Sequence, residues 1–171
     1  MEENTEDQQR EINILFVCSG NTCRSVMAQE LCRKIWEEEL SPEDKKNIAL
    51  NVSSAGLQAV DGTVTAPEVV KLLTEEGWFF PGKKAEQLKG ELVEKADFIF
   101  TMTFSQKQEV NQRFPGVREK VWQITEYPGV DTVKEIADPI GGALKRYQQT
   151  ADEIKRTVKK IVEQQLKRRE M

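Results

Sequence analysis

The 171-residue chain contains no histidine. Histidine is the side chain that enzymes use most often for general acid–base catalysis, and it is the commonest metal ligand in proteins. Its absence excludes Ser-His-Asp and Cys-His nucleophile systems, phosphohistidine intermediates and histidine-ligated metals. Any proton transfer must therefore fall to Asp, Glu, Cys, Lys or Tyr side chains.

Disulfides, membrane spans and excess positive charge are also missing. The three cysteines, an odd number, do not form the pattern of a disulfide scaffold. No apolar run approaches the length of a membrane span, and the first residues, "MEENTEDQQRE", lack the basic head and apolar segment of a secretion signal. The net charge of −4 argues against a nucleic-acid partner. We therefore expect a cytoplasmic protein without a membrane or nucleic-acid partner; the sequence does not fix its oligomeric state, and a monomer is the default expectation.

The chain alternates short apolar runs with amphipathic stretches. Four runs are typical of buried strands: residues 12–17, 48–54, 97–103 and 120–124. Helical patterns cover residues 24–40, 86–96 and 106–114. A further helical segment begins after Thr65, its expected cap, and ends at Gly77, and a long one begins at about Ala143. "SPEDKKN" is interpreted as a break. This alternation predicts a single α/β domain with a parallel sheet over residues 12–171, preceded by a flexible acidic tail at residues 1–11.

A polar loop, "CSGNTCRS", joins the first predicted strand to the first predicted helix. Gly20 and Asn21 tolerate positive φ, so the loop can curl and turn its backbone N–H groups inward around an anion. The start of the helix adds the positive end of its dipole, and Arg24 adds a guanidinium that can grip two phosphate oxygens. The same positive field favours the thiolate form of Cys18. The loop therefore predicts a site that holds a tetrahedral oxyanion and points a nucleophile at its central atom.

Other interpretations of this loop remain open. A cysteine at a strand end is commonly a small buried hydrophobe, and Arg24 can be a solvated first-turn residue. The loop matches neither the G-x-x-x-x-G-K-[ST] pattern of a Walker loop nor the G-x-G-x-x-G pattern of a dinucleotide site.

A long connection, residues 125–142, follows the fourth predicted strand and contains four acids. Loops of this length inside a compact domain are usually functional or disordered. In a parallel sheet the loops at the carboxyl ends of the strands meet at one edge, so we expect this connection to approach Cys18. Asp131, Glu135 and Asp138 on this connection are therefore candidates for an acid at the site; the family resemblance described next implies Asp138, in "ADPIGG", with Asp131 and Glu135 as alternatives.

"VCSGNTCRS" resembles the signature loop, C-x5-R-[ST], of the low-molecular-weight protein tyrosine phosphatases. The resemblance extends over residues 12 to about 165 and includes "SSAG", "ADFIFTMT" and the late "DP". It implies a four-stranded parallel twisted sheet with helices on both faces. It also implies a phosphorylated protein as substrate and neither a cofactor nor a metal.

The resemblance also implies the role of each site residue. Cys18 would be the nucleophile that forms a phosphocysteine intermediate, Arg24 would stabilise the transferring phosphoryl group, and Asp138 would be the general acid and base. The phosphate-binding residues would be Ser19, Gly20, Asn21, Thr22, Cys23, Arg24 and Ser25. Ser25 would also assist departure of the Cys18 thiolate.

Two further features concern the support and protection of the loop. In the family, serines brace the loop asparagine, here Asn21 with Ser25 and Ser54, and a histidine often completes this support. The position in this chain that aligns with the family's histidine lies near Lys83, so the support from histidine is expected to be missing or replaced. A reversible Cys18–Cys23 disulfide is as plausible as a purely structural role for Cys23.

Thr22 and the residues after Asp138 are the features of the sequence that indicate the substrate. The resemblance associates threonine at this loop position with bacterial protein-arginine phosphatases, and isoleucine with eukaryotic tyrosine phosphatases. "DPIGG" lacks the aromatic residues that commonly wall a tyrosine ring. We therefore favour a phosphoarginine phosphatase. The alternatives are a tyrosine phosphatase, an arsenate reductase, which would need cysteines after Cys32, and a non-catalytic phosphate-binding regulator.

Overall fold

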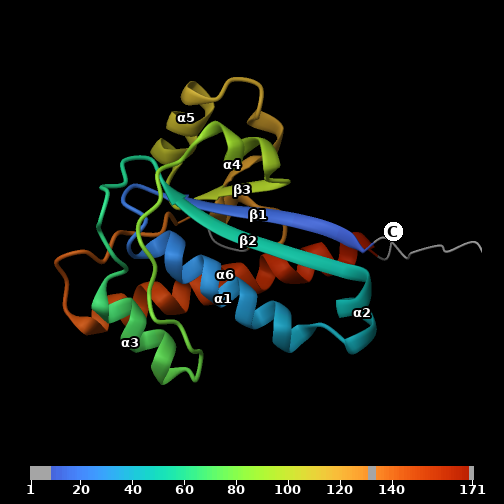
Figure 1. Cartoon of the computed structure of the whole chain (residues 1–171), viewed down its shortest axis with the longest axis horizontal. Helices are drawn as coiled ribbons and strands as arrows, with labels where there is room; N and C mark the ends of the chain where they lie inside the picture. Colours follow the sequence, from blue (N-terminus) through green and yellow to red (C-terminus); the bar gives the residue numbers. More distant parts are fainter. Residues whose placement is uncertain (1–8, 131–133, 170–171) are drawn as a thin grey trace, which may run out of the picture.

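The strands form one sheet in the order β2-β1-β3-β4, and all neighbouring pairs are parallel (Figure 1). The structure, a computed structural model, describes residues 9–130 and 134–169. The strands are β1 (Arg10–Cys18), β2 (Ile48–Gly56), β3 (Phe98–Thr101) and β4 (Val121–Gln123). The helices are α1 (Arg24–Glu39), α2 (Pro42–Asn47), α3 (Pro67–Glu75), α4 (Gly90–Lys95), α5 (Phe104–Arg113) and α6 (Leu144–Arg169), with 3-10 turns at Arg118–Lys120 and Ile124–Glu126.

The sheet is buried on both faces, which explains why β1 is an almost continuous apolar run. Ile14, Phe16 and Cys18 point into the larger core, which is shared with α1 and α6. Leu15 and Val17 point into the smaller core beneath α4 and α5. Figure 1 shows α1, α3 and α6 on one side of the sheet and α4 and α5 on the other. The predicted fold class, a single α/β domain with a four-stranded parallel sheet and helices on both faces, is confirmed.

The register places the carboxyl ends of the strands at one edge. Cys18 pairs with Gly56, Val17 pairs with Thr101, and Thr101 pairs with Gln123. The loops that leave these residues therefore gather at the same edge, as expected for a parallel sheet.

Several predicted boundaries were wrong by a few residues. β1 begins at Arg10 rather than at the predicted residue 12, because Arg10 and Glu11 pair with Ile48 and Ala49. The rest of the predicted tail, residues 1–8, lies outside the described residues. β2 continues to Gly56 because it keeps pairing with β1 to the last residue. β3 and β4 are shorter than predicted, and residues 102 and 103 serve the start of α5, whose capping box joins Thr103 and Gln106.

Two predictions about helices were wrong, one because of a local cap and the other because of a tertiary contact. "SPEDKKN" forms α2 rather than a break, because the Ser41 hydroxyl caps it by accepting from the N–H of Asp44 at 3.2 Å, and Pro42 suits a first helical position. The predicted helix at residues 86–96 shrinks to α4. Its first residues bond instead to the end of β2, where the Gly56 N–H donates to the Glu86 carbonyl and the Leu88 N–H donates to the Gly56 carbonyl, both at 2.8 Å.

Thr65 does not cap α3, whose N-cap is Ala66. The Thr65 hydroxyl instead bonds to the backbone of Lys83. Within residues 9–130 and 134–169, no helix is both long and apolar enough to cross a bilayer.

Candidate active site

Cys18 is the last residue of β1, and Arg24 is the first residue of α1. The Cys18 Sγ lies 2.9 Å from the Ser25 hydroxyl and is buried beneath the loop. The first turn of α1 contains no acidic residue, and no side chain caps it. The positive end of the α1 dipole is therefore directed at the loop, with no acidic residue of the helix's own first turn to neutralise it.

Asn21 gives the loop its curled shape. It is the one non-glycine residue with positive φ, 55°, in the described part of the chain, and it is fully buried. Its side-chain amide donates to the hydroxyls of Ser25, at 2.9 Å, and Ser54, at 3.0 Å. Asparagine reaches the left-handed region more readily than most residues, and these bonds stabilise it there. The predicted bracing by the two serines is therefore present in the structure.

Gly56, at the end of β2, allows the loop to lie against the sheet. A Cβ at this position would lie 2.7 Å from the Ser19 carbonyl oxygen and 3.0 Å from the Asn21 nitrogen. Both neighbours are backbone atoms, so they can make room only if the loop itself shifts. Nothing local in "SSAG" indicated this role for its glycine.

Replacing Gly56 with alanine is expected to lower the free energy of unfolding by about 1–3 kcal/mol, because the added methyl group overpacks the loop against the sheet. Urea titration would measure this change, and activity should fall with it. Gly90→Ala is the matched control, because a Cβ there would meet the Phe114 ring at an ordinary 3.9 Å. Equal stability of the two variants would show that the close approach at Gly56 imposes no constraint.

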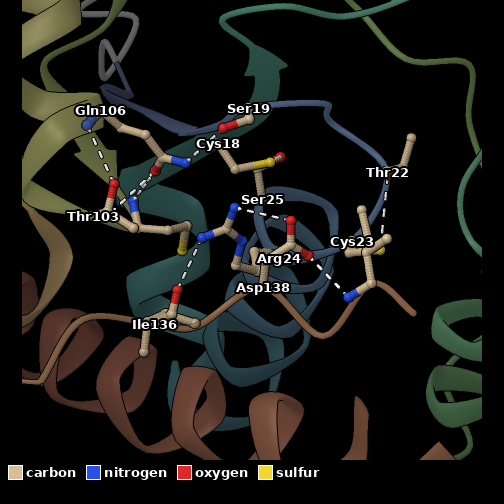
Figure 2. A network of polar contacts seen from close by, with 12 residues as sticks. Cys18, Ser19, Thr22, Cys23, Arg24, Ser25, Thr103, Gln106, Ile136 and Asp138 are labelled. Carbon is tan, nitrogen blue, oxygen red and sulfur yellow. Dashed lines mark hydrogen bonds and ion pairs between the residues drawn. The ribbon is translucent and has the colours of Figure 1, made fainter. Parts of the chain in front are cut away.

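Gln106 in α5 supports the loop from the other side, a contact that the sequence reasoning missed. Its amide nitrogen donates to the Ser19 hydroxyl at 3.1 Å (Figure 2). Its oxygen accepts from the N–H groups of Met102 and Thr103, which fixes the orientation of the amide. The S/T-x-x-E/Q pattern of the capping box was a visible signal for the helix start, but nothing local indicated that the glutamine also reaches Ser19.

Arg24 connects the loop to the long connection before α6. Its guanidinium is buried and donates to the Ile136 carbonyl oxygen at 2.9 Å and, at 3.5 Å, to the carboxylate of Asp138 (Figure 2). The Asp138 side chain is 42% exposed, so one side of it is open to solvent. Its other carboxylate oxygen accepts from the Ile140 N–H at 3.0 Å, which holds the side chain in place. The structure thus brings Cys18, Arg24 and Asp138 together at one edge of the sheet.

The two alternative acids are placed differently. Glu135 is directed at α5, where its carboxylate accepts from the Phe104 N–H at 2.7 Å. Asp131 lies outside the described residues. Of the two acids that the structure describes, Asp138 is the one that contacts Arg24.

Cys23 and Tyr147 form the wall of the loop on the α6 side. Burial raises the pKa of the Cys23 thiol, whereas hydrogen bonds from Thr22 and Tyr147 lower it. Burial and the neighbouring Cys23 raise the pKa of the Tyr147 hydroxyl to about 12. Cys23 is therefore held as a neutral thiol next to the loop. All three cysteines are free thiols here, and the Cys18–Cys23 bridge stays a prediction.

Cys32 lies in the core on the inner side of α1, as expected. Complete burial raises the pKa of its thiol to about 12, so it behaves as a small apolar side chain.

The fold and the Cys-x5-Arg-Ser loop at its edge define the class of protein, which is a phosphatase. The family model for "Low molecular weight phosphotyrosine protein phosphatase" matches residues 13–171, and the chain belongs to this family.

Known relatives act on two kinds of phosphorylated residue. The chain is 34% identical to a protein-arginine-phosphatase of Bacillus subtilis, over 90% of this chain and 96% of that protein. It superimposes with a TM-score of 0.80 on a cysteine-to-serine mutant of the YwlE arginine phosphatase with a phosphorylated active site serine, at 33% identity over 90% of this chain and 95% of the other. It also matches the solution structure of a low molecular weight protein tyrosine phosphatase from Bacillus subtilis, with a TM-score of 0.80 and 34% identity over 92% and 99% of the two chains.

Proposed function

We propose that this phosphatase removes phosphate from phosphoarginine in proteins by way of a phosphocysteine intermediate. The observation that carries the substrate choice is the wall of the site. Thr22 occupies the loop with its side chain half-buried, and the acid loop continues after Pro139 as Ile140, Gly141 and Gly142. None of residues 139–142, directly after Asp138, is aromatic and able to stack on a tyrosine ring, and the open carboxylate is suited to a planar cation. The similarity to protein-arginine phosphatases supports the same choice.

The first step would transfer the phosphoryl group to sulfur. The Cys18 thiolate attacks phosphorus, the S–P bond forms and the P–N bond to the guanidino group breaks. The carboxyl group of Asp138 gives its proton to the departing nitrogen. Arg24 and the N–H groups of the loop bind the equatorial phosphoryl oxygens as charge spreads over them.

The second step would regenerate the thiolate. The Asp138 carboxylate takes a proton from water, the water oxygen bonds to phosphorus, and the S–P bond breaks with its electrons returning to Cys18. The Ser25 hydroxyl, 2.9 Å from the sulfur, stabilises the negative charge that reappears there. Inorganic phosphate leaves, and no metal or cofactor takes part in this scheme.

Steady-state kinetics on matched substrates test the proposed specificity. The same peptide sequence carrying either phosphoarginine or phosphotyrosine should give the higher kcat/KM with phosphoarginine. Equal or better turnover of phosphotyrosine would replace the proposal with a tyrosine phosphatase. Hydrolysis of neither substrate by a well-folded protein would favour a phosphate-binding role.

Thr22→Ile should shift the ratio of the two kcat/KM values towards phosphotyrosine by about tenfold, because isoleucine removes the hydroxyl and adds apolar surface against a ring. The ratio of the two kcat/KM values is compared, because general damage to the loop lowers both values and leaves their ratio unchanged. The Thr22 backbone is held independently of the side chain, because its carbonyl accepts from the Ala66 N–H at 3.0 Å. An unchanged ratio would mean that Thr22 does not select the substrate.

A further inference from the structure

Lys83 sends its side chain under the phosphate-binding loop from the segment between α3 and α4. Its backbone is fixed to Thr65, whose N–H and hydroxyl both bond to the Lys83 carbonyl, at 3.0 and 3.2 Å. The Lys83 N–H in turn donates to the Thr65 hydroxyl at 3.0 Å. Thr65 is itself buried, so the lysine starts from a rigid position.

The ammonium group of Lys83 has an oxygen acceptor for each of its three hydrogens. It lies 2.7 Å from the Asn21 side-chain oxygen, and 3.2 Å from both the carbonyl and the hydroxyl oxygen of Ser54. An ammonium group can only donate, so these contacts have one direction. Lys83 therefore binds the left-handed residue of the loop and the strand residue that supports it.

The direction of the hydrogen bonds is set from Lys83 through to Cys18. The Asn21 side-chain oxygen accepts from Lys83 and from the Glu86 N–H at 3.0 Å, so its amide nitrogen must face the two serines. The Ser54 hydroxyl accepts from Asn21 and gives its one hydrogen to the Gln29 side-chain oxygen at 2.7 Å.

Ser25 completes this chain of hydrogen bonds. Its hydroxyl oxygen accepts from Asn21, which leaves its one hydrogen available to the Cys18 sulfur, 2.9 Å away; when Cys18 is a thiolate, the serine is the donor. A hydrogen bond in that direction stabilises a thiolate rather than a thiol.

The charge of Lys83 acts in the same sense. Burial lowers the pKa of Lys83, while Glu86, Cys18 and Glu30 raise it and Arg33 lowers it further. The Lys83 ammonium and a thiolate at Cys18 would therefore attract each other, in addition to the chain of hydrogen bonds.

We propose that Lys83 is a positioning residue for the phosphate-binding loop, whose ammonium group holds Asn21 in its left-handed conformation and, through Asn21 and Ser25, stabilises the Cys18 thiolate. This proposal rests on the proposed function, in which Cys18 is the nucleophile. In this chain, which has no histidine, the support for Asn21 would come from a lysine that donates three hydrogen bonds from below the loop.

The test compares Lys83→Met with wild type in the alkylation of Cys18 by iodoacetamide as a function of pH. The thiolate is the species that reacts, so the midpoint of the rate profile reports its stability. We expect the midpoint to rise by about one pH unit, and kcat for p-nitrophenyl phosphate to fall by about tenfold while KM changes by less than about threefold. Mass spectrometry must assign the label to Cys18, because all three cysteines are buried and burial does not distinguish them.

Two further variants separate positioning from general damage. Lys84→Met changes an exposed lysine next in sequence and should behave as wild type. Lys83→Arg keeps the charge and the donors and should recover most of the lost rate. If Lys83→Met does not fold, Lys83→Gln, which keeps a donor but removes the charge, should still raise the midpoint.

A midpoint for Lys83→Met or Lys83→Gln equal to that of Lys84→Met would overturn the proposal. Failure of the proposed function gives a different result: the midpoint for Lys83→Met would still exceed that of Lys84→Met, while the wild-type protein would prefer the phosphotyrosine peptide or hydrolyse neither peptide.

Discussion

Cys18→Ser is expected to reduce kcat on a phosphoarginine protein by more than about 10⁴-fold. A serine hydroxyl has nearly the same shape as a thiol, but it does not ionise near neutral pH, so the attacking anion is lost while the anion site remains. The measurement is release of inorganic phosphate under single-turnover and steady-state conditions. Phosphate should still bind and protect the variant from thermal unfolding, because Arg24 and the loop N–H groups are unchanged.

Cys32→Ala is the matched control for this variant. Cys32 is also a buried cysteine, but it lies in the core on the inner side of α1, away from the loop. Its substitution should leave kcat within about threefold of wild type. Residual turnover of Cys18→Ser above about 1% of wild type would exclude the phosphocysteine intermediate and favour direct attack by water.

Asp138→Asn should lower kcat on phosphoarginine by about 10²–10⁴-fold, because asparagine can neither give a proton to the leaving nitrogen nor take one from water. The loss should depend on the leaving group. A guanidino nitrogen needs a proton as it departs, whereas p-nitrophenolate leaves easily without one, so formation of the phosphoenzyme should suffer far less with p-nitrophenyl phosphate. Burst kinetics on the two substrates measure this step separately.

Glu135→Gln is the control, because it changes the alternative acid on the same connection. Glu135 bonds to the start of α5, so its substitution should leave kcat unchanged within about twofold. The same loss for both substrates in Asp138→Asn would contradict the role of acid and would indicate that Asp138 acts through its contact with Arg24, at 3.5 Å. A large loss in Glu135→Gln instead would move the acid to that residue.

Local pattern was sufficient for the parts of the site that are continuous in sequence. The apolar run that ends at Cys18, the five-residue turn and the helix that starts at Arg24 form one strand-loop-helix unit, so residue types and spacing alone predicted its shape. Two predictions failed in short segments: residues 41–47 were predicted as a break and form α2, and residues 86–88 were predicted as helix and are not. In such segments caps and single tertiary bonds outweigh periodicity.

The support of the loop depends on contacts between distant segments. Lys83 and Asn21 are separated by 62 positions, and Gln106 and Ser19 by 87, so no local pattern joins them. The resemblance indicated only that the support for Asn21 was missing or replaced. Gly56 was visible as a glycine, but its reason, the loop backbone 2.7 Å from a would-be Cβ, exists only when β1 and β2 are paired.

By itself the sequence determined which residues form the anion loop and that a histidine takes no part, because these depend on residue type and on spacing within about ten positions. The tertiary structure decided that Asp138 rather than Glu135 faces Arg24, and that Lys83, Gly56 and Gln106 hold the loop. The physical reason is the parallel sheet, whose register brings the carboxyl ends of all four strands to one edge and so joins segments that are far apart in the chain.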